Sequence, residues 1–195
     1  MTGAVFCKNY ASPDFDRREI LRYASCREAD AAVLSLMEEC ITECAPALSY
    51  RVCFAYFPVR NGSVDMGFAK LESAALAKNL IGCGTACVFA ATVGMNADRL
   101  ISRYSLLSPA KALMFDAIGT ERIESLCDAF CEDVRGEYGR ICPRFSPGYG
   151  DLPIDAQRDI FAALTPEKRI GLTLNGSLLM SPSKSVTAVV GIYKT

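Results

Sequence analysis

The residues best suited to chemistry gather in one segment, which begins at Arg144 and reads RFSPGYGD. Pro147 fixes φ near the value needed at the second position of a turn, and Gly148 supplies the positive φ of the third position of a type II turn. The segment therefore predicts a tight turn from Ser146 to Tyr149 with main-chain groups facing outward. Arg144 adds a fork of donors suited to a carboxylate, and Tyr149 adds a flat apolar ring. Together these groups suit a small zwitterionic ligand that bears a ring; an ordinary surface turn with a solvated arginine is the alternative interpretation.

The chain has no histidine, which removes the commonest general acid/base and the commonest metal ligand. Ser-His-Asp and Cys-His chemistry is therefore excluded. Ten cysteines are present, and six of them form pairs at a four-residue spacing: Cys40 and Cys44, Cys83 and Cys87, Cys127 and Cys131. On a helix this spacing puts two thiols on one face, where they could hold a soft metal. Because a closed site needs four ligands, small core residues explain the pairs better.

Composition indicates an ordinary globular chain. Its 195 residues, 51% apolar and 22% charged, are enough for one well-buried domain, which we expect to span residues 1–195. The net charge of −1 and the lack of a basic cluster argue against nucleic acid as a partner. Charged residues soon after the N-terminus argue against a secretory signal, and glycines interrupt the long uncharged stretch at 79–97, so we expect no membrane span. Free thiols in a reducing compartment, and hence a cytoplasmic location, follow from the cysteine content.

Periodicity and turn signals predict the elements that must position the segment after residue 143. Helices are expected over 13–23, 27–45, 73–80, 108–138 and 155–164, with Gly119 as a possible interruption of the fourth. Strands are expected over 50–58, 64–68, 85–93, 170–174, 177–180 and 186–193, with Asn61-Gly62 as a hairpin turn between the first two. Helices and strands do not alternate regularly, which favours an α+β fold with a largely antiparallel mixed sheet and flanking helices.

A second segment extends the pattern of the first. Ile170-Gly171 is followed by Met180, Pro182 and Lys184-Ser185-Val186. In this order and separation, the two segments resemble the activation domain of cobalamin-dependent methionine synthase. The likeness is to short, free-standing members of that family, whose pattern runs R-x-S-P-G-Y-G-D, then I-G, then M-x-P-x-K-S-V. The resemblance covers about residues 70 to 192. We therefore distinguish an N-terminal part of the domain, residues 1–70, from residues 71–195, which contain the part that the resemblance covers.

The resemblance implies a function that needs no histidine. Members of the family bind S-adenosylmethionine and offer its methyl group to a cobalamin carried by another domain or protein, after an electron donor has reduced the inert cob(II) state. Methyl transfer from a sulfonium to cobalt requires orientation rather than proton transfer. The implied protein is a reactivation subunit for a separate methionine synthase that lacks its own activation domain, with a flavodoxin-like protein as a possible electron donor.

The family motif assigns roles to residues of this chain. It implies that Arg144 holds the methionine carboxylate, and that Ser146, Gly148 and Tyr149 contribute backbone and ring contacts to the nucleoside end. This interpretation requires an Arg144 guanidinium that is not locked in an internal ion pair. The motif also implies that Lys184 meets an acidic partner or the corrinoid, although a lysine in a hairpin turn is the simpler interpretation.

Asp128 aligns with a glutamate that faces the ligand in full-length enzymes of the family. It also lies in line with Glu124 and Glu132 at four-residue steps, which is typical of a solvated helix face. We favour the solvated face while retaining Asp128 as a candidate ligand-binding residue.

Two departures from the full-length enzymes support an alternative function. Gly176 stands where they commonly carry glutamate, and Val190 where they carry a ligand-contacting tyrosine. The alternative is a non-catalytic docking or assembly module for a corrinoid protein, which no longer binds S-adenosylmethionine. A thiol or metal protein built on the cysteine pairs is a third hypothesis.

Overall fold

One long strand, β2 (Tyr50–Arg60), organises the fold, and the structure, a computed structural model, describes residues 4–26 and 28–194. On one side β2 pairs with β1 (Phe6–Tyr10) and with β3 (Ser63–Asp65), which in turn pairs with β4 (Lys70–Leu71). On the other side β5 (Cys83–Thr92) pairs with β2, and β8 (Ser185–Tyr193) forms the far edge. Every pairing is antiparallel, and a separate ribbon joins β6 (Thr173–Leu174) to β7 (Met180–Ser181). The predicted α+β class with an antiparallel sheet is confirmed.

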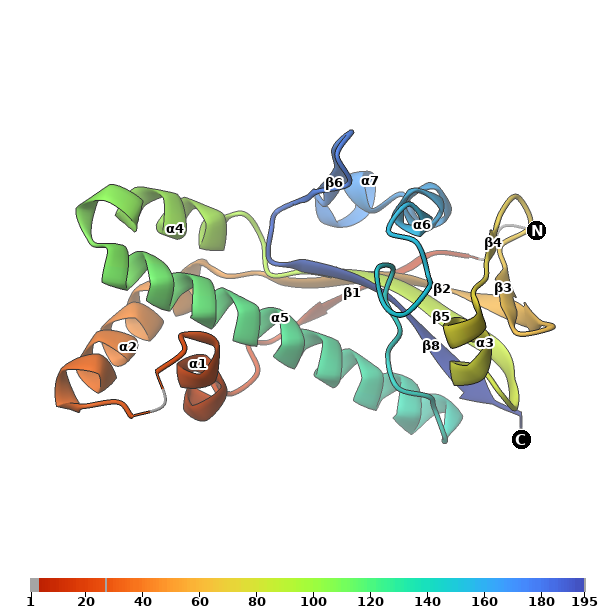
Figure 1. The fold of residues 1–195 in the computed structure, drawn as a ribbon, viewed down its shortest axis with the longest axis horizontal. Coiled ribbons are helices and arrows are strands. Elements are labelled where there is room, and N and C mark those ends of the chain that lie inside the picture. Colours follow the sequence, from red (N-terminus) through yellow and green to blue (C-terminus); the bar gives the residue numbers. More distant parts are fainter. Residues whose placement is uncertain (1–3, 27, 195) are drawn as a thin grey trace.

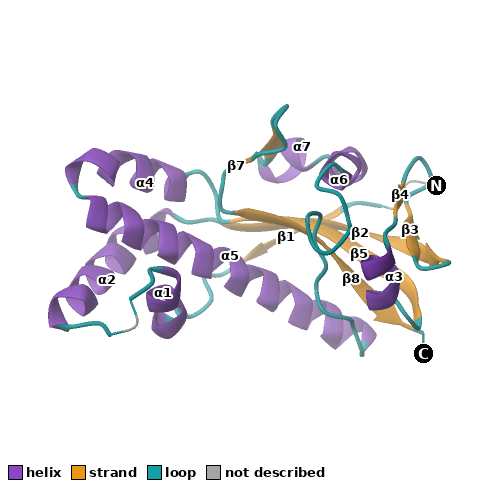
Figure 2. Cartoon of the chain, in the orientation of Figure 1, coloured by secondary structure: helices purple, strands orange, loops and turns teal. Residues whose placement is uncertain are grey.

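Helices cover both faces of the sheet (Figure 1). The second half of the long helix α5 (Pro109–Tyr138) packs on one face of the sheet, and its Leu126 and Phe130 lie in the core between helix and sheet. The opposite face is covered by α3 (Ala74–Asn79), α6 (Ala156–Leu164) and α7 (Pro166–Ile170). A third core surrounds the first half of α5, where α1 (Arg17–Tyr23), α2 (Ala31–Cys44) and α4 (Asn96–Leu107) pack beyond the end of the sheet (Figure 2).

Most predicted elements are present. The expected helices at 73–80, 108–138 and 155–164 correspond to α3, α5 and α6, and Ser73 caps α3 by accepting a hydrogen bond from the Leu76 N–H. The helix expected over 27–45 is α2, which gives way to a 3-10 turn at Ala45–Ala47 around Pro46; Arg27 lies outside the described residues. The Asn61-Gly62 turn joins β2 to β3, as predicted.

Several predictions of local structure are wrong. The chain forms β1, α4 and α7 where no element was expected, and the strand predicted over 170–174 is helical at Ile170 and extended only at Thr173–Leu174. The strand predicted over 177–180 is found at Met180–Ser181. Gly119 does not interrupt α5. The missing side chain leaves room for the stem of Lys184, because a Cβ at Gly119 would lie 2.9 Å from Cγ of that lysine.

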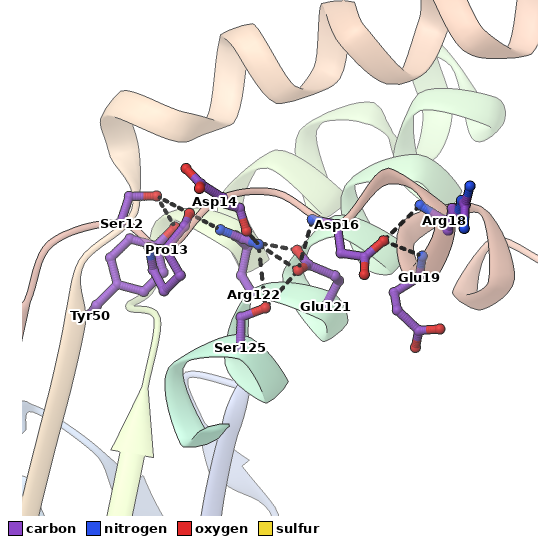
Figure 3. A network of polar contacts seen from close by, with 10 residues as sticks. All are labelled: Ser12, Pro13, Asp14, Asp16, Arg18, Glu19, Tyr50, Glu121, Arg122 and Ser125. Atoms are coloured by element: carbon purple, nitrogen blue, oxygen red, sulfur yellow. Dashed lines mark hydrogen bonds and ion pairs between the residues drawn. The ribbon is translucent and has the colours of Figure 1, made fainter. Parts of the chain in front are cut away.

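A buried ionic network fixes the N-terminal segment to α5 (Figure 3). Arg122 is 0% exposed and donates to the carbonyl oxygens of Pro13 and Asp14, at 2.5 and 2.7 Å, and to the neighbouring Glu121. Glu121 in turn accepts from the Asp16 N–H at 3.3 Å. Asp16 is the cap of α1, so the buried pair on α5 is bonded to the residue at which α1 begins.

All ten cysteines are free thiols, and the six at four-residue spacing are buried. Burial raises the pKa of Cys44 to about 12, so this thiol stays protonated and behaves as a small apolar core residue. None of the helices in the described part of the chain combines the length and the apolar character needed to cross a membrane.

Candidate functional site

A cleft of about 660 Å³ opens between the second half of α5, the loop that follows it, α6 and the free edge of β8. Its walls carry most of the candidate residues from the sequence together with others that were not expected. The main polar residues are Glu124, Asp128, Glu132, Arg135, Arg144, Ser146, Tyr149, Gln157 and Thr187.

The cleft exists because the edge of β8 is covered along only part of its length. The loop after α5 runs beside β8 and exchanges two main-chain hydrogen bonds between Phe145 and Val189, at 2.9 and 2.8 Å. The chain then turns away at Ser146. Since alternate residues of a strand direct their N–H and C=O groups to the same side, those of Thr187 face the same edge as those of Val189. The open edge therefore offers the main chain of Thr187 to the cleft.

The turn after Phe145 has the predicted form. The Tyr149 N–H donates to the Ser146 carbonyl at 3.0 Å, and Gly148 has a φ of +89°. The prediction that main-chain groups face outward is wrong for two N–H groups. That of Tyr149 closes the turn, and that of Gly148 donates to the Leu152 carbonyl at 2.9 Å. Gly148 thus has a conformational role, while the side chain of Tyr149 is 58% exposed.

Both ends of the loop are fastened to α3. The carboxylate of Asp151 accepts from the N–H groups of Ala74 and Ala75, each at 2.9 Å, and at the other end of the helix the amide of Asn79 donates to the Pro143 carbonyl at 3.1 Å. Gly150 permits the close approach, because a Cβ there would lie 2.7 Å from that of Ala75. The last two residues of the RFSPGYGD segment therefore hold the turn in place.

Arg144 is held in two ion pairs with α5. Its Nη2 atom donates to Oε2 of Glu124 at 2.9 Å and to Oδ1 of Asp128 at 2.8 Å. This is an internal ion pair, which runs against the expectation of a guanidinium free to bind a ligand. Both bonds leave from the same nitrogen, however, and among the described residues no partner bonds the Nε or Nη1 hydrogens. The guanidinium thus keeps three N–H donors, one on Nε and two on Nη1, which can each make a single hydrogen bond to a ligand; both edges that bind a carboxylate through two nitrogens include the occupied Nη2.

The acidic residues of α5 do not form a purely solvated face. Glu124 and Asp128 meet Arg144, while Glu132 pairs with Arg135. Three carboxylates therefore share the cleft with two guanidinium groups. A site with excess negative charge favours a ligand that carries positive charge.

Cys131 lines the cleft but is not a nucleophile. Burial raises the pKa of Cys131 to about 11, and it also raises the pKa of Cys127 one helical turn earlier on α5. Both therefore stay protonated near neutral pH, and the thiolate is the reactive form of cysteine. The described residues also contain no group of three or more metal-binding side chains.

The structure brings four of the six residues proposed from the sequence to the cleft: Asp128, Arg144, Ser146 and Tyr149. Gly148 does not line it. Lys184 lies elsewhere, where its Nζ atom donates to Asp116 at 2.8 Å and to Thr120 at 2.9 Å, and its side chain is only 12% exposed. Lys184 does lie in the bend between β7 and β8, but its charge is paired within the chain. Its contact with an acidic partner or a corrinoid stays a prediction.

The two positions that depart from the family lie outside the cleft lining. Val190 is fully buried in the core between the sheet and α5. Gly176 is in the β6–β7 connection, with open space where a Cβ would project. Exposed Tyr149 is the aromatic ring that the cleft does contain.

The residues of the cleft wall that sequence reasoning missed include Gln157 and Thr187. Both are buried, and Oε1 of Gln157 and Oγ1 of Thr187 have no hydrogen-bond partner in the described part of the chain. The one signal in the sequence is that each is a polar residue at a core position, Gln157 of a predicted helix and Thr187 of a predicted strand.

No protein-family model matches the sequence, and no curated protein matches it significantly. Comparison with solved structures does find a protein of similar fold, in the crystal structure of the MetH reactivation domain bound to AdoHcy, with a TM-score of 0.70. The chain has the fold of that reactivation domain. The match covers 97% of this chain and 78% of the other at 15% sequence identity, so the likeness includes the N-terminal helices that the motifs did not reach.

Proposed function

We propose that this chain binds S-adenosylmethionine in the cleft beside Arg144 and acts in trans as a reactivation subunit for a cobalamin-dependent methionine synthase that lacks its own activation domain. The observation that carries the proposal is the likeness of nearly the whole chain to a reactivation domain whose crystal structure contains AdoHcy. The motif that suggested this family from the sequence forms one wall of the cleft.

The residues of the cleft fit the parts of such a ligand. The Nε and Nη1 hydrogens of Arg144 can each donate a single hydrogen bond to its carboxylate, and the carboxylates of Glu124 and Asp128 suit its ammonium and sulfonium charges. The exposed ring of Tyr149 offers a face for the adenine base. When bound, the ligand supplies an electrophilic methyl group, and the chain's own contribution is to bind and orient it.

Calorimetry with S-adenosylmethionine and S-adenosylhomocysteine tests the binding step. We expect a dissociation constant in the range of about 1 μM to 1 mM for the wild type, and affinity at least about tenfold weaker for Arg144→Ala. Arg99→Ala is the matched control, because Arg99 lies on α4 and does not line the cleft. Its affinity should equal that of the wild type.

The action in trans requires a second assay. A methionine synthase without an activation domain, loaded with cob(II)alamin, is mixed with this chain, S-adenosylmethionine and a reductant, for which a flavodoxin-like protein is the proposed donor. Formation of methylcobalamin, followed by absorbance, should depend on the chain and fail with Arg144→Ala.

The second candidate function is a docking or assembly module for a corrinoid protein that does not bind the methyl donor. The observation in its favour is the internal ion pairing of Arg144, together with a buried valine at position 190. Absence of both heat and thermal stabilisation with millimolar ligand would support the module and contradict the primary proposal.

A further inference from the structure

Two polar side chains on the cleft wall are buried without a bonding partner. Gln157 is 6% exposed and Thr187 2% exposed, and Oε1 of the first and Oγ1 of the second have no hydrogen-bond partner in the described part of the chain. Buried polar atoms are nearly always bonded, so two exceptions at one cleft require an explanation. Arg51 Nε, which is also without a partner, does not line this cleft.

The two residues lie in the same layer of the structure. Val189 packs in the core that contains Ile160 of α6, and Thr187, two residues earlier on β8, points to the same face of the sheet. Gln157 precedes Ile160 by one helical turn and so lies on the same side of α6. Both side chains therefore project between β8 and α6 where the cleft opens, beside the free main-chain edge of Thr187.

The chemistry of these groups differs from that of the rest of the cleft. Arg144, Glu124 and Asp128 are charged and match the amino-acid end of the proposed ligand, while the Tyr149 ring matches its base. A threonine hydroxyl and a glutamine amide are neutral, and each both donates and accepts. Sugar hydroxyl groups need partners of this kind, and a bond made in a buried setting is shielded from competing water.

We propose that Gln157 and Thr187 bind the ribose hydroxyl groups of the adenosyl ligand, with the ligand supplying the missing partners of the two buried atoms. The inference rests on the proposed function, because it assumes an adenosyl compound in this cleft. It adds two binding residues that belong to neither segment of the sequence motif.

Thr187→Val in the full chain tests the inference, because it removes the hydroxyl at constant shape. The melting temperature without ligand should be unchanged or higher, since an unpartnered polar atom is removed. The affinity for S-adenosylhomocysteine should nevertheless fall about tenfold. Opposite effects on stability and affinity distinguish a binding role from a structural one. Thr42→Val, on an exposed face of α2, is the control and should leave affinity unchanged.

A comparison of ligands tests the assignment to ribose. The 2′-deoxy and 3′-deoxy analogues of S-adenosylhomocysteine should bind the wild type more weakly than the parent compound. That difference should disappear in Thr187→Val or in Gln157→Leu. If Gln157→Leu lowers the melting temperature, a loss of affinity in that variant could come from lost stability. The assignment to ribose is then judged from Thr187→Val alone.

Three outcomes overturn the inference. Tight binding by both variants would leave the proposed function intact and remove these residues from the site. Weaker binding with an undiminished preference for the parent compound would exclude contact with ribose. Failure of the wild type to bind at millimolar ligand would refute the proposed function, and the inference with it.

Discussion

The guanidinium of Arg144 donates a hydrogen bond of 2.8 Å to the carboxylate of Asp128, which lies sixteen residues earlier in the chain, on α5. The contact joins the loop of the RFSPGYGD segment to the long helix. Because it uses Nη2 alone, it orients the guanidinium while the hydrogens on Nε and Nη1 remain available for single hydrogen bonds. Asp128 itself remains 71% exposed and can meet a positive ligand at the same time.

Asp128→Asn should reduce the preference for a sulfonium ligand over a thioether. The wild-type carboxylate attracts the positive charge of S-adenosylmethionine but not the neutral sulfur of S-adenosylhomocysteine, so we expect the ratio of their affinities to fall by about threefold to tenfold. Stability should change by less than about 1 kcal/mol, because the Asp128 side chain is 71% exposed. Calorimetry with both ligands and thermal unfolding provide the two measurements.

Asp155→Asn is the matched control for that experiment. Asp155 has the same side-chain exposure, 71%, and also lies beside an arginine, Arg158, but it does not line the cleft. An equal fall in the affinity ratio for both variants would mean that general surface charge, rather than Asp128, selects the sulfonium.

Asp151 should position the loop through its bonds to α3. Asp151→Ala removes both bonds and should weaken ligand binding by about threefold to tenfold, whereas Asp151→Asn should retain most of the affinity because asparagine also caps a helix. Hydrogen exchange at the amides of the Ser146–Tyr149 turn should quicken only in the alanine variant. Rapid exchange in the asparagine variant as well would show that charge, rather than the hydrogen bonds, holds the loop.

The same carboxylate makes a pH-dependent contribution to stability. Bonds from the Ala75 N–H, the Ser73 side chain and the Ala74 N–H hold the pKa of Asp151 below its ordinary value. Since the pKa in the folded state is the lower one, the stabilisation is fully present above the unfolded value, about 3.9, and is lost as the pH falls through the folded value. The difference in melting temperature between wild type and Asp151→Ala should therefore shrink as the pH is lowered below about 4.

Much of this architecture is predictable from local patterns, since α3, α5 and α6 have caps or long apolar stripes. The missed elements lacked such signals. Strand β1 is almost entirely exposed, so its sequence shows no alternation of apolar and polar residues. Its main-chain hydrogen bonds to β2 hold it in place rather than burial of its side chains. Helix α4 begins without a side-chain cap and buries only Ala97 completely.

Prediction of the site from the sequence failed for different reasons. The turn at Pro147-Gly148 follows from backbone restrictions and was predicted correctly. The partners of Arg144 and Lys184 were not, because Glu124 and Asp116 are distant in sequence and only the packing of α5 brings them near. Gln157 and Thr187 were missed since a lone polar residue in a periodic segment has no local signature.

Gly150→Ala and Gly136→Ala should change stability in opposite directions. Gly150 has a φ of +54°, and a Cβ there would lie 2.7 Å from Cβ of Ala75, so alanine forces the loop away from α3 and should destabilise the protein by about 1–3 kcal/mol. Gly136 is an exposed residue of α5 with open space around it, and alanine there should stabilise by about 0.5–1 kcal/mol. Urea unfolding measures both, and a stable Gly150→Ala would show that the loop moves without cost.

Arg122→Met should be the most destabilising of these substitutions. It leaves the carboxylate of Glu121, which is 2% exposed, without its cation, and it leaves the carbonyl groups of Pro13 and Asp14 without a donor. Removing one partner of a buried pair costs about 3–5 kcal/mol, and urea unfolding should show a loss of that size.

The double variant Glu121→Leu/Arg122→Met separates the ion pair from the packing. If the loss in Arg122→Met comes from the uncompensated charge, removing that charge as well should recover part of the stability, because apolar replacements of buried pairs are often tolerated. A double variant less stable than Arg122→Met would instead show that the bonds of Glu121 to Asp16 and Ser125 hold α1 against α5. Neither residue lines the cleft, so ligand affinity of the folded variants should match the wild type and confirm that the network supports the fold rather than the site.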